Sequence, residues 1–226
     1  MIKPTKEFLE VFKSTNGALS VTESIAIMNL TAQLNPRIYL DLDVNISYPL
    51  KSLWLELGTH EGKSSMSALY GNKHVDEFLL VDPEFNKSIN IKTIADTFNK
   101  VIKKQMKFVF VEDYSTVVLS TTNYKFSYCF VDSGSHQDGL PMQEVKLLED
   151  RMVQGGIIAF HDFRSQFVEV EEAYNYLLGT GKYEEIIIDW REITDYVDEN
   201  NLEEGNQSWH HTELKNPCFV GAVKRK

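Results

Sequence analysis

The sequence predicts an α/β protein in which a mostly parallel sheet is covered by helices on both faces. Five short apolar runs have the length of buried strands, and stretches long enough for crossover helices separate them. These runs are 53–57, 78–81, 107–111, 126–131 and 156–160. Two further apolar runs, 184–189 and 217–223, complete seven predicted strands, the last of them antiparallel. With 226 residues and 42% hydrophobic content, the chain 1–226 is expected to form one domain.

A helical extension is expected over residues 1–50, ahead of a core over 51–226. Ser20 and Glu23 have the spacing of a capping box, in which each side chain binds a free backbone amide at a helix start. Ile25, Met28 and Ala32 follow at helical spacing, and Pro36 ends the run. Two helices are therefore predicted before the first strand.

Two crossover helices are clear from the sequence pattern. One begins at Asp138 as N-cap and runs to a stop at Gly155 and Gly156. The other begins near Phe167 and ends at Gly179. Apolar residues recur along both at spacings of three and four, which is typical of helices packed on one face.

Charge and composition restrict the partners. The net charge of −10 argues against a nucleic-acid partner, because binding a phosphate backbone requires a basic face. No stretch approaches eighteen apolar residues, so no membrane span is expected. The opening segment is charged and lacks an apolar signal core. Cys129 and Cys218 lie in apolar runs and are interpreted as free thiols, which favours a reducing, cytoplasmic location.

Right-handed crossovers place the carboxyl ends of all parallel strands at one edge of the sheet, where ligands bind. The segment 190–214 joins the last two strands and lies over this edge if the last strand is antiparallel. Because structureless loops of such length are uncommon, it is expected to be either a lid or partly disordered. It contains Trp209-His210-His211, interpreted as an aromatic wall for a substrate, a metal site or plain surface.

A glycine-containing loop follows the first strand. The run from Glu56 to Ser64 has Gly58 and Gly62, which permit a tight turn and a close approach of the backbone to a ligand. It lacks the GK[ST] of a phosphate loop, and His60 replaces the middle glycine of GxGxxG. Asp82 ends the second strand, where it could accept hydrogen bonds from two ribose hydroxyls, or serve only as a cap.

Four motifs carry a family resemblance. ELGTHEGKSS, VDPEF, FVDSGSH and QGGIIAFHDF occur in the order and spacing of class I S-adenosylmethionine-dependent methyltransferases. Over roughly residues 50–180 the chain resembles the branch with the catechol and macrocin O-methyltransferases and the family called class 24. The resemblance implies a Rossmann-like methyltransferase fold and S-adenosylmethionine as cofactor.

The resemblance also implies which residues bind this cofactor. Glu56, Gly58 and Gly62 would line its methionine and sulfonium end, and Ser64 at the helix start would meet its carboxylate. Asp82 would hold the ribose, while Asp113 and Ser115 fall where the family contacts adenine, although Ser115 fits a plain turn nearly as well. The complete predicted set is Glu56, Gly58, Thr59, Gly62, Ser64, Asp82, Asp113 and Asp132.

Two acids follow the fourth and fifth strands, Asp132 and Asp162. In the metal-dependent O-methyltransferases the corresponding acids bind a divalent cation such as Mg²⁺, which lowers the pKa of the acceptor hydroxyl. The sequence departs from that pattern at Phe163, often a third ligand, and in the loop Asp132-Ser-Gly-Ser-His136, which is one residue longer and has one carboxylate fewer. Alternatively, Asp132 only positions the cofactor and Asp162 only caps the next segment.

His136 and His161 are the candidate bases, and Asp132 completes the predicted catalytic set. Imidazole can take a hydroxyl proton near neutral pH, and the alternative for each histidine is a structural role. The predicted function is methyl transfer from S-adenosylmethionine to a hydroxyl of a small molecule, such as a sugar or natural product. The alternative is a cofactor-binding pseudoenzyme or scaffold, and whether the chain forms a homo-oligomer stays open.

Overall fold

The computed structural model describes residues 1–34, 52–72, 74–101, 107–134, 136–202 and 219–226. Its centre is a seven-stranded sheet in the order β3-β2-β1-β4-β5-β7-β6. The strands are β1 (Leu53–Leu57), β2 (Glu77–Val81), β3 (Lys107–Val111), β4 (Phe126–Val131), β5 (Met152–Phe163), β6 (Tyr183–Glu185) and β7 (Phe219–Arg225). β7 runs antiparallel to β5 and β6, and the pairs from β3 to β5 are parallel. The predicted mostly parallel sheet with an antiparallel last strand is confirmed.

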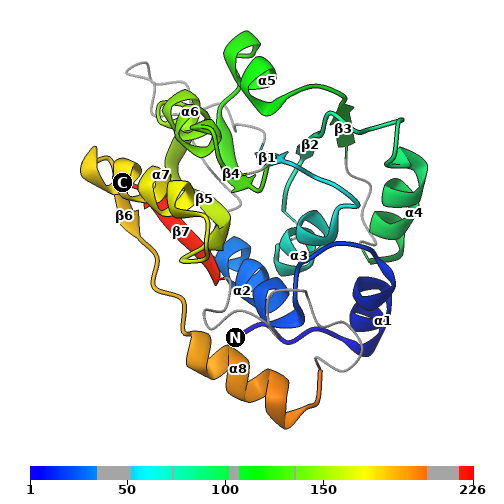
Figure 1. Ribbon diagram of the computed structural model, residues 1–226. Coiled ribbons are helices and arrows are strands. Elements are labelled where there is room, and N and C mark those ends of the chain that lie inside the picture. The colour runs from blue at the N-terminus through cyan, green and yellow to red at the C-terminus, as the bar shows by residue number, and fades with distance from the viewer. Residues whose placement is uncertain (35–51, 73, 102–106, 135, 203–218) are drawn as a thin grey trace, which may run out of the picture.

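Helices cover both faces of this sheet (Figure 1). The described helices are α1 (Lys6–Ser14), α2 (Val21–Ala32), α3 (Lys63–Gly71), α4 (Ile91–Val101), α5 (Ser115–Thr121), α6 (Leu140–Leu148), α7 (Val168–Gly179) and α8 (Trp190–Glu199). Helices α1 to α4 and α8 pack on one face, and α5 to α7 pack on the other. None of the described helices is long and apolar enough to cross a membrane.

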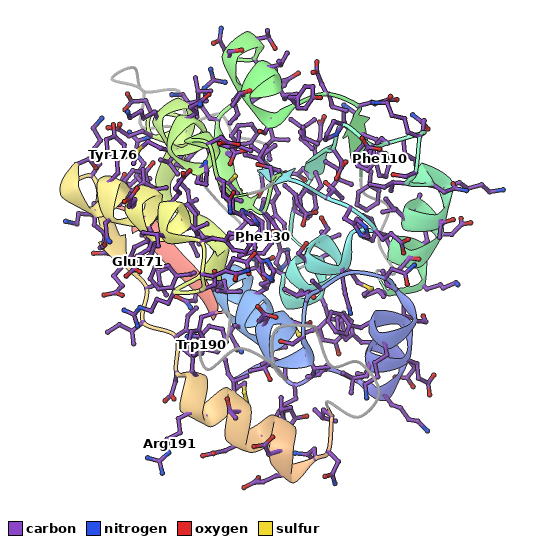
Figure 2. All side chains as sticks on the ribbon, viewed as in Figure 1. Phe110, Phe130, Glu171, Tyr176, Trp190 and Arg191 are labelled. Atoms are coloured by element: carbon purple, nitrogen blue, oxygen red, sulfur yellow. The ribbon has the colours of Figure 1, made fainter. Side chains whose placement is uncertain are left out.

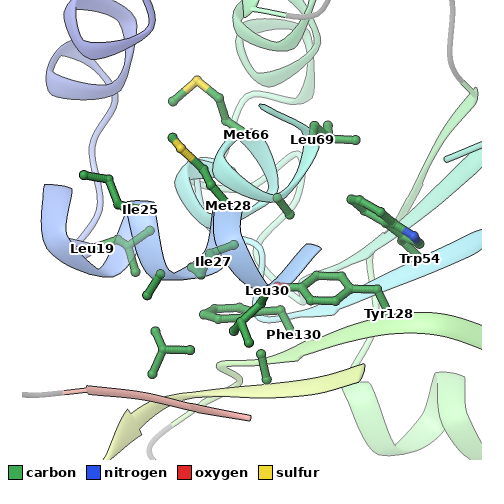
Figure 3. Packing of buried hydrophobic residues seen from close by; sticks show 14 of the residues in the cluster. Leu19, Ile25, Ile27, Met28, Leu30, Trp54, Met66, Leu69, Tyr128 and Phe130 are labelled. Atoms are coloured by element: carbon green, nitrogen blue, oxygen red, sulfur yellow. The ribbon is translucent and has the colours of Figure 1, made fainter. Parts of the chain in front are cut away.

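Strand alternation divides the core into two layers. Trp54 and Tyr128 face α2 and α3, with their ring centroids 5.1 Å apart, whereas Leu55 faces α5 to α7. Figure 3 shows the α2 side chains between α3 and the strands. The same alternation directs Glu56, two residues after Trp54, toward α3. A carboxyl group is thereby carried into an otherwise apolar layer.

The two predicted N-terminal helices are present, and α2 is joined closely to α3. The capping box of Ser20 and Glu23 forms as expected. The hydroxyls of Ser24 and Ser67 lie 2.7 Å apart across the helix pair. Gly71 lies so close to the backbone of Met28 that a Cβ there would overlap the carbonyl oxygen. The extension is therefore part of the core layer, with its position fixed by contacts with α3.

Two predicted boundaries were wrong near the fifth strand. Gly139, not Asp138, is the N-cap of α6, and the helix ends at Leu148. Gly155 and Gly156 lie inside β5, where the pairing with β4 shifts register between Phe126 and Tyr128. Gly155 has φ +75°. Because a left-handed glycine can end a helix or form a bulge, the pattern alone did not distinguish these two roles.

The segment after β6 also differs from expectation. The predicted strand 184–189 is confined to Tyr183–Glu185, and α8 begins after Asp189, its N-cap. Ile193 and Val197 of α8 are buried on the side of α2, so the first half of 190–214 has apolar anchors that were not expected. In Figure 2 the labelled Trp190 starts this helix, and the charged residues beyond it are mostly exposed.

Several expectations lie outside the described residues. Pro36, Cys218 and the second half of the predicted lid, including Trp209-His210-His211, belong to this group. The lid therefore stays a prediction. Cys129, by contrast, lies within β4 and is a buried free thiol, as predicted.

The α2–α3 contact predicts the outcome of two glycine substitutions. We expect Gly71→Ala to lower the free energy of unfolding by about 1–3 kcal/mol, because the added methyl group overlaps α2. Gly179→Ala is the matched control: it also ends a helix, but no neighbouring atom of the described residues lies within 4 Å of its Cβ position. It should leave stability unchanged or raise it by up to about 1 kcal/mol. Urea unfolding followed by circular dichroism would measure both, and equal effects would contradict this account of the packing.

Candidate active site

The strand ends meet at one edge of the sheet as predicted. The amide of Gly58 donates to Val81 O at 2.9 Å, and the amide of Asp132 donates to Leu57 O at 2.9 Å. These bonds continue the parallel ladders one residue beyond the strands. The loops after β1, β2 and β4 are therefore held side by side by backbone hydrogen bonds.

The glycines of the loop after β1 have different structural roles. Gly58 has φ +80°, and a Cβ there would overlap the backbone of Asp132 and Ser133, so the close approach is to the end of β4. Gly62 has φ +78° and is the N-cap of α3, where no side chain of the described residues caps the first amides. These amides and the positive end of the helix dipole suit an anionic ligand.

Glu56 is fully buried beneath this loop. Its carboxyl oxygens accept hydrogen bonds from the hydroxyls of Ser64 and Ser65 at the start of α3. Burial raises the pKa of Glu56 to about 8, although these two hydrogen bonds oppose the change. The Ser64 hydroxyl, expected to meet the cofactor carboxylate, is directed to Glu56 here.

Asp82 shapes the neighbouring loop. Its two carboxylate oxygens accept hydrogen bonds from the amides of His60 and Glu84, both at 2.8 Å. The side chain is buried and borders the cavity described next. Each oxygen has a second lone pair, so the carboxylate can still accept a hydrogen bond from a ligand.

A cavity of about 490 Å³ lies above these loops. Of the predicted site residues, Gly58, Thr59, Ser64, Asp82, Asp132, His136, His161 and Asp162 line it. The hydroxyl of Thr59 is buried and has no hydrogen-bond partner among the described residues, so it is available to a ligand. Asp113 does not line the cavity, and its carboxylate accepts a hydrogen bond from the amide of Tyr114.

The segment between α1 and α2 forms another wall of the cavity, which the sequence analysis missed. The amide and side chain of Asn16 donate to the carboxylate of Glu61, at 3.1 and 3.0 Å. Lys63 Nζ donates to Gly17 O at 3.3 Å. No local pattern indicates these contacts, because they join residues about 45 positions apart in the chain.

At one end of the cavity two acids and two histidines come together. His136 Nε2 lies 3.2 Å from Asp132 Oδ1 and 3.2 Å from Asp162 Oδ2. His161 Nδ1 lies 3.1 Å from the same Asp132 oxygen and 3.4 Å from the same Asp162 oxygen. One ligand atom from each of the four residues lies within 4.8 Å of the others. We call Asp132, His136, His161 and Asp162 the acid–histidine cluster.

The backbone directs these side chains into the cavity. In β5, His161 continues the alternation of Ile157 and Ala159 and so faces α2. The next residue would point to the opposite face, but Asp162 has φ +55°, beside a register shift in the pairing with β7. His136 also has a left-handed backbone, φ +53°. Such conformations cost about 1–3 kcal/mol each and concentrate at functional sites.

The charges of the cluster reinforce one another. Burial would raise the pKa of Asp132, but His161 and His136 hold it below its ordinary value. Burial lowers the pKa of His136, yet hydrogen bonds to Asp132 and Asp162 raise it to about 9. Burial likewise opposes charge on His161, and the carboxylates of Asp132 and Glu23 raise its pKa well above the ordinary value. With no ligand bound, the cluster thus favours charged histidines between carboxylates.

Two buried glutamates support the cluster. Glu23 Oε1 lies 3.2 Å from His161 Nε2, and its other oxygen accepts the Ser20 hydrogen bonds of the capping box. Glu144 of α6 accepts a hydrogen bond from the hydroxyl of Ser133, which lines the cavity. The capping box was recognised from the sequence, but its contact with the site depends on how α2 packs.

The fold and the sequence were compared with known proteins. Residues 55–163 match the class 24 family model, described as a methyltransferase domain. Among curated proteins, no sequence matches the chain significantly. An O-methyltransferase from Bacillus cereus in complex with SAH has a similar structure, with a TM-score of 0.59 and 11% identity, covering 100% of this chain and 93% of that chain.

Two other similar structures act on other acceptors, according to their descriptions. An rRNA methylase from Streptococcus thermophilus has a TM-score of 0.54 and 9% identity, covering 88% of this chain and 93% of that chain. An N-methyltransferase from Bradyrhizobium japonicum has a TM-score of 0.51 and 12% identity, with 88% and 93% covered. At such low identity these structures establish the fold and leave the acceptor undecided.

The sheet order, the antiparallel last strand and the cavity at the strand ends define a class I S-adenosylmethionine-dependent methyltransferase fold. Within that class, the resemblance to the class 24 family that the sequence predicted is confirmed at residues 55–163, which match its methyltransferase-domain model.

The buried Glu56 carboxyl predicts a pH-dependent stability. Because its folded pKa of about 8 lies above the ordinary 4.5, the unfolded chain releases this proton first, and the folded state loses stability as the pH rises from 4.5 toward 8. Glu56→Gln removes this loss. Relative to the unsubstituted chain, its free energy of unfolding should therefore rise by about 1.4 kcal/mol for each pH unit crossed.

Urea unfolding at several pH values between 5 and 8 would measure this difference. Glu172→Gln, an exposed substitution on α7, is the control and should give a curve parallel to that of the unsubstituted chain. A parallel curve for Glu56→Gln as well would show that this carboxyl does not retain its proton in the folded state.

Proposed function

We propose that this protein transfers the methyl group of S-adenosylmethionine to a hydroxyl of a small molecule. The observation that carries the proposal is that one cavity is lined both by the loop from Gly58 to Ser64 and by the acid–histidine cluster. A cofactor bound by the loop would lie next to groups able to take a proton. Methyl transfer requires the cofactor and the proton-accepting groups to lie side by side, because the sulfur, the methyl carbon and the acceptor oxygen must lie in line.

The cofactor end of the cavity has groups that suit S-adenosylmethionine. The uncapped amides of α3 would bind its carboxylate, and the unpartnered Thr59 hydroxyl is available for a polar group. Asp82, fixed by two backbone amides, would accept hydrogen bonds from the ribose. Glu56, Gly58 and Gly62 would form the floor and the turn beneath the methionine portion. An adenine contact at Asp113 has less support, because this residue does not line the cavity.

The acid–histidine cluster would act on the acceptor. As the new bond forms between the acceptor oxygen and the methyl carbon, the bond from that carbon to sulfur breaks and its electron pair stays on sulfur. The acceptor proton passes to a basic group, for which the carboxylate of Asp132 is suitably placed, as is His136 or His161 once it has lost the proton that the cluster favours. The adjoining carboxylates would then stabilise a protonated imidazole.

The family resemblance implied Mg²⁺ held by Asp132 and Asp162. Such an ion would lower the pKa of the acceptor hydroxyl. The two carboxylates fit Mg²⁺, but the two imidazole nitrogens among them do not, because Mg²⁺ prefers oxygen ligands. We therefore derive no step through Mg²⁺.

A small hydroxylated acceptor, such as a sugar or natural product, suits the chain better than a nucleic acid. The net charge of −10 opposes binding to a phosphate backbone, although the rRNA methylase shares the fold. The rest of the acceptor pocket would come from the segment beyond α8, acting as the lid of this single domain. A cytoplasmic location is consistent with the free Cys129 thiol.

Cofactor binding tests the first half of this proposal. We expect S-adenosylmethionine and S-adenosylhomocysteine to bind, and Asp82→Ala to weaken binding at least ~10-fold, or ~1.4 kcal/mol, through the lost carboxylate acceptor. Asp96→Ala, on the exposed side of α4, is the control and should bind as the unsubstituted chain does. Calorimetry would measure all three proteins. Undetectable binding by the unsubstituted chain would remove the basis of the proposal.

Turnover tests the second half. Incubation with S-adenosylmethionine and a panel of catechols, sugars and simple amines should yield S-adenosylhomocysteine only with hydroxylated acceptors. We expect His136→Gln to lower that rate by ~10²-fold or more, because the cluster loses an acid–base group, while cofactor affinity is retained. Cofactor binding without turnover on any acceptor would favour the pseudoenzyme alternative.

A further inference from the structure

The acid–histidine cluster has the spacing of a coordination sphere. Two atoms about 2.1 Å from one ion lie about 3.0 Å apart at a right angle and about 3.4 Å apart at the tetrahedral angle. The four nitrogen-to-oxygen distances in the cluster are 3.1, 3.2, 3.2 and 3.4 Å. One carboxylate oxygen from each aspartate and one ring nitrogen from each histidine could therefore reach a common ion with little movement.

The chemistry of these donors selects the ion. Imidazole nitrogen suits iron, cobalt, nickel and zinc, whereas Mg²⁺ is bound mainly through carboxylates and water. Two carboxylates carry a charge of −2, which balances a divalent cation when both imidazoles are neutral. Three members of the cluster are buried, so a charge left uncompensated there would be costly.

Glu23 provides the partner that a ligating histidine needs. If Nδ1 of His161 binds an ion, Nε2 must carry the proton, and this atom lies 3.2 Å from Glu23 Oε1. Both atoms are buried, and neither has a hydrogen-bond partner among the described residues, so this ion-pair contact is the one that the structure gives them. Carboxylates in this position fix the tautomer and orientation of metal-bound histidines. The capping box holds Glu23 in place through Ser20.

We propose that Asp132, His136, His161 and Asp162 form a binding site for a divalent transition-metal ion, and that Glu23 is a positioning residue for His161. The site therefore differs from the all-oxygen Mg²⁺ site that the resemblance implied. The inference rests on the proposed function, since the ion would lie in the same cavity. With the histidine nitrogens bound to it, the ion would lower the pKa of the acceptor hydroxyl in place of a histidine base. The inference can be tested without methyl transfer, because ion binding is measurable alone.

The test uses the full chain, freed of metal with a chelator and titrated with Co²⁺ or Mg²⁺ in a calorimeter. We expect one Co²⁺ to bind at least 100-fold more tightly than Mg²⁺, with visible absorption bands that report nitrogen ligands. His136→Ala and His161→Ala should each weaken Co²⁺ binding at least 10-fold and change these bands. Glu23→Gln should weaken binding about 10-fold, because a neutral amide is a poorer partner for the metal-bound imidazole.

One variant serves as a control. His74→Ala removes an exposed histidine outside the cavity. It should bind Co²⁺ within about 3-fold of the unsubstituted chain, and circular dichroism would verify that every variant is folded.

Three results would each overturn the inference. They are a lack of Co²⁺ binding, Mg²⁺ binding as strong as that of Co²⁺, and Co²⁺ binding that the histidine substitutions do not change. S-adenosylmethionine affinity is measured on the same samples. Cofactor binding without Co²⁺ binding would leave the proposed function standing and make the cluster a metal-free acid–base group. Co²⁺ binding without cofactor binding would support the metal site and remove the basis of the proposed function.

Discussion

The parallel pairing of β1, β4 and β5 places Leu57, Val131 and Phe160 level with one another in adjacent strands. The residues that follow them, Gly58, Asp132 and His161, must therefore lie next to each other. All three line the cavity at this edge, whereas apolar helices cover the two faces of the sheet. The cavity, the cofactor loop and the acid–histidine cluster all depend on this register, which a shift of one residue would destroy.

Carboxyl groups in so buried a place need partners, and the structure supplies them from helices. Glu56 is satisfied by two serines of α3, and Glu144 by Ser133. Glu23 reaches His161 from α2, so the N-terminal helices belong to the site as well as to the core. The close contact between Gly71 and Met28 fixes α2 against α3, and thereby fixes the position of Glu23. Packing and site geometry are linked through this one helix.

The site consists of more than the two acids at the strand ends. Asp132 and Asp162 were expected to face one place, and they do. The two histidines were expected as separate candidate bases, but each lies within 3.4 Å of both acids. Shared contacts of this kind make the four side chains one electrostatic unit, in which the protonation of each residue depends on the others.

Local pattern by itself determined the strands, the two N-terminal helices, the capping box and the acids and glycines at the strand ends. These features depend on alternation, helical spacing and turn chemistry, which are properties of neighbouring residues. The errors fell where one local signal serves two structures: Gly155 suited a helix stop and a bulge, and residues 186–188 are apolar although β6 ends at Glu185.

Only the tertiary structure decided which distant side chains meet. Asn16 with Glu61, Glu23 with His161 and Ser133 with Glu144 pair across helices and loops whose relative placement no local signal records. The left-handed backbone of Asp162 belongs to the same group, since a β-bulge beside β7 turns that carboxylate into the cavity. The physical reason is that local propensities act over a few residues, whereas these contacts follow from how complete elements pack once their apolar faces are buried.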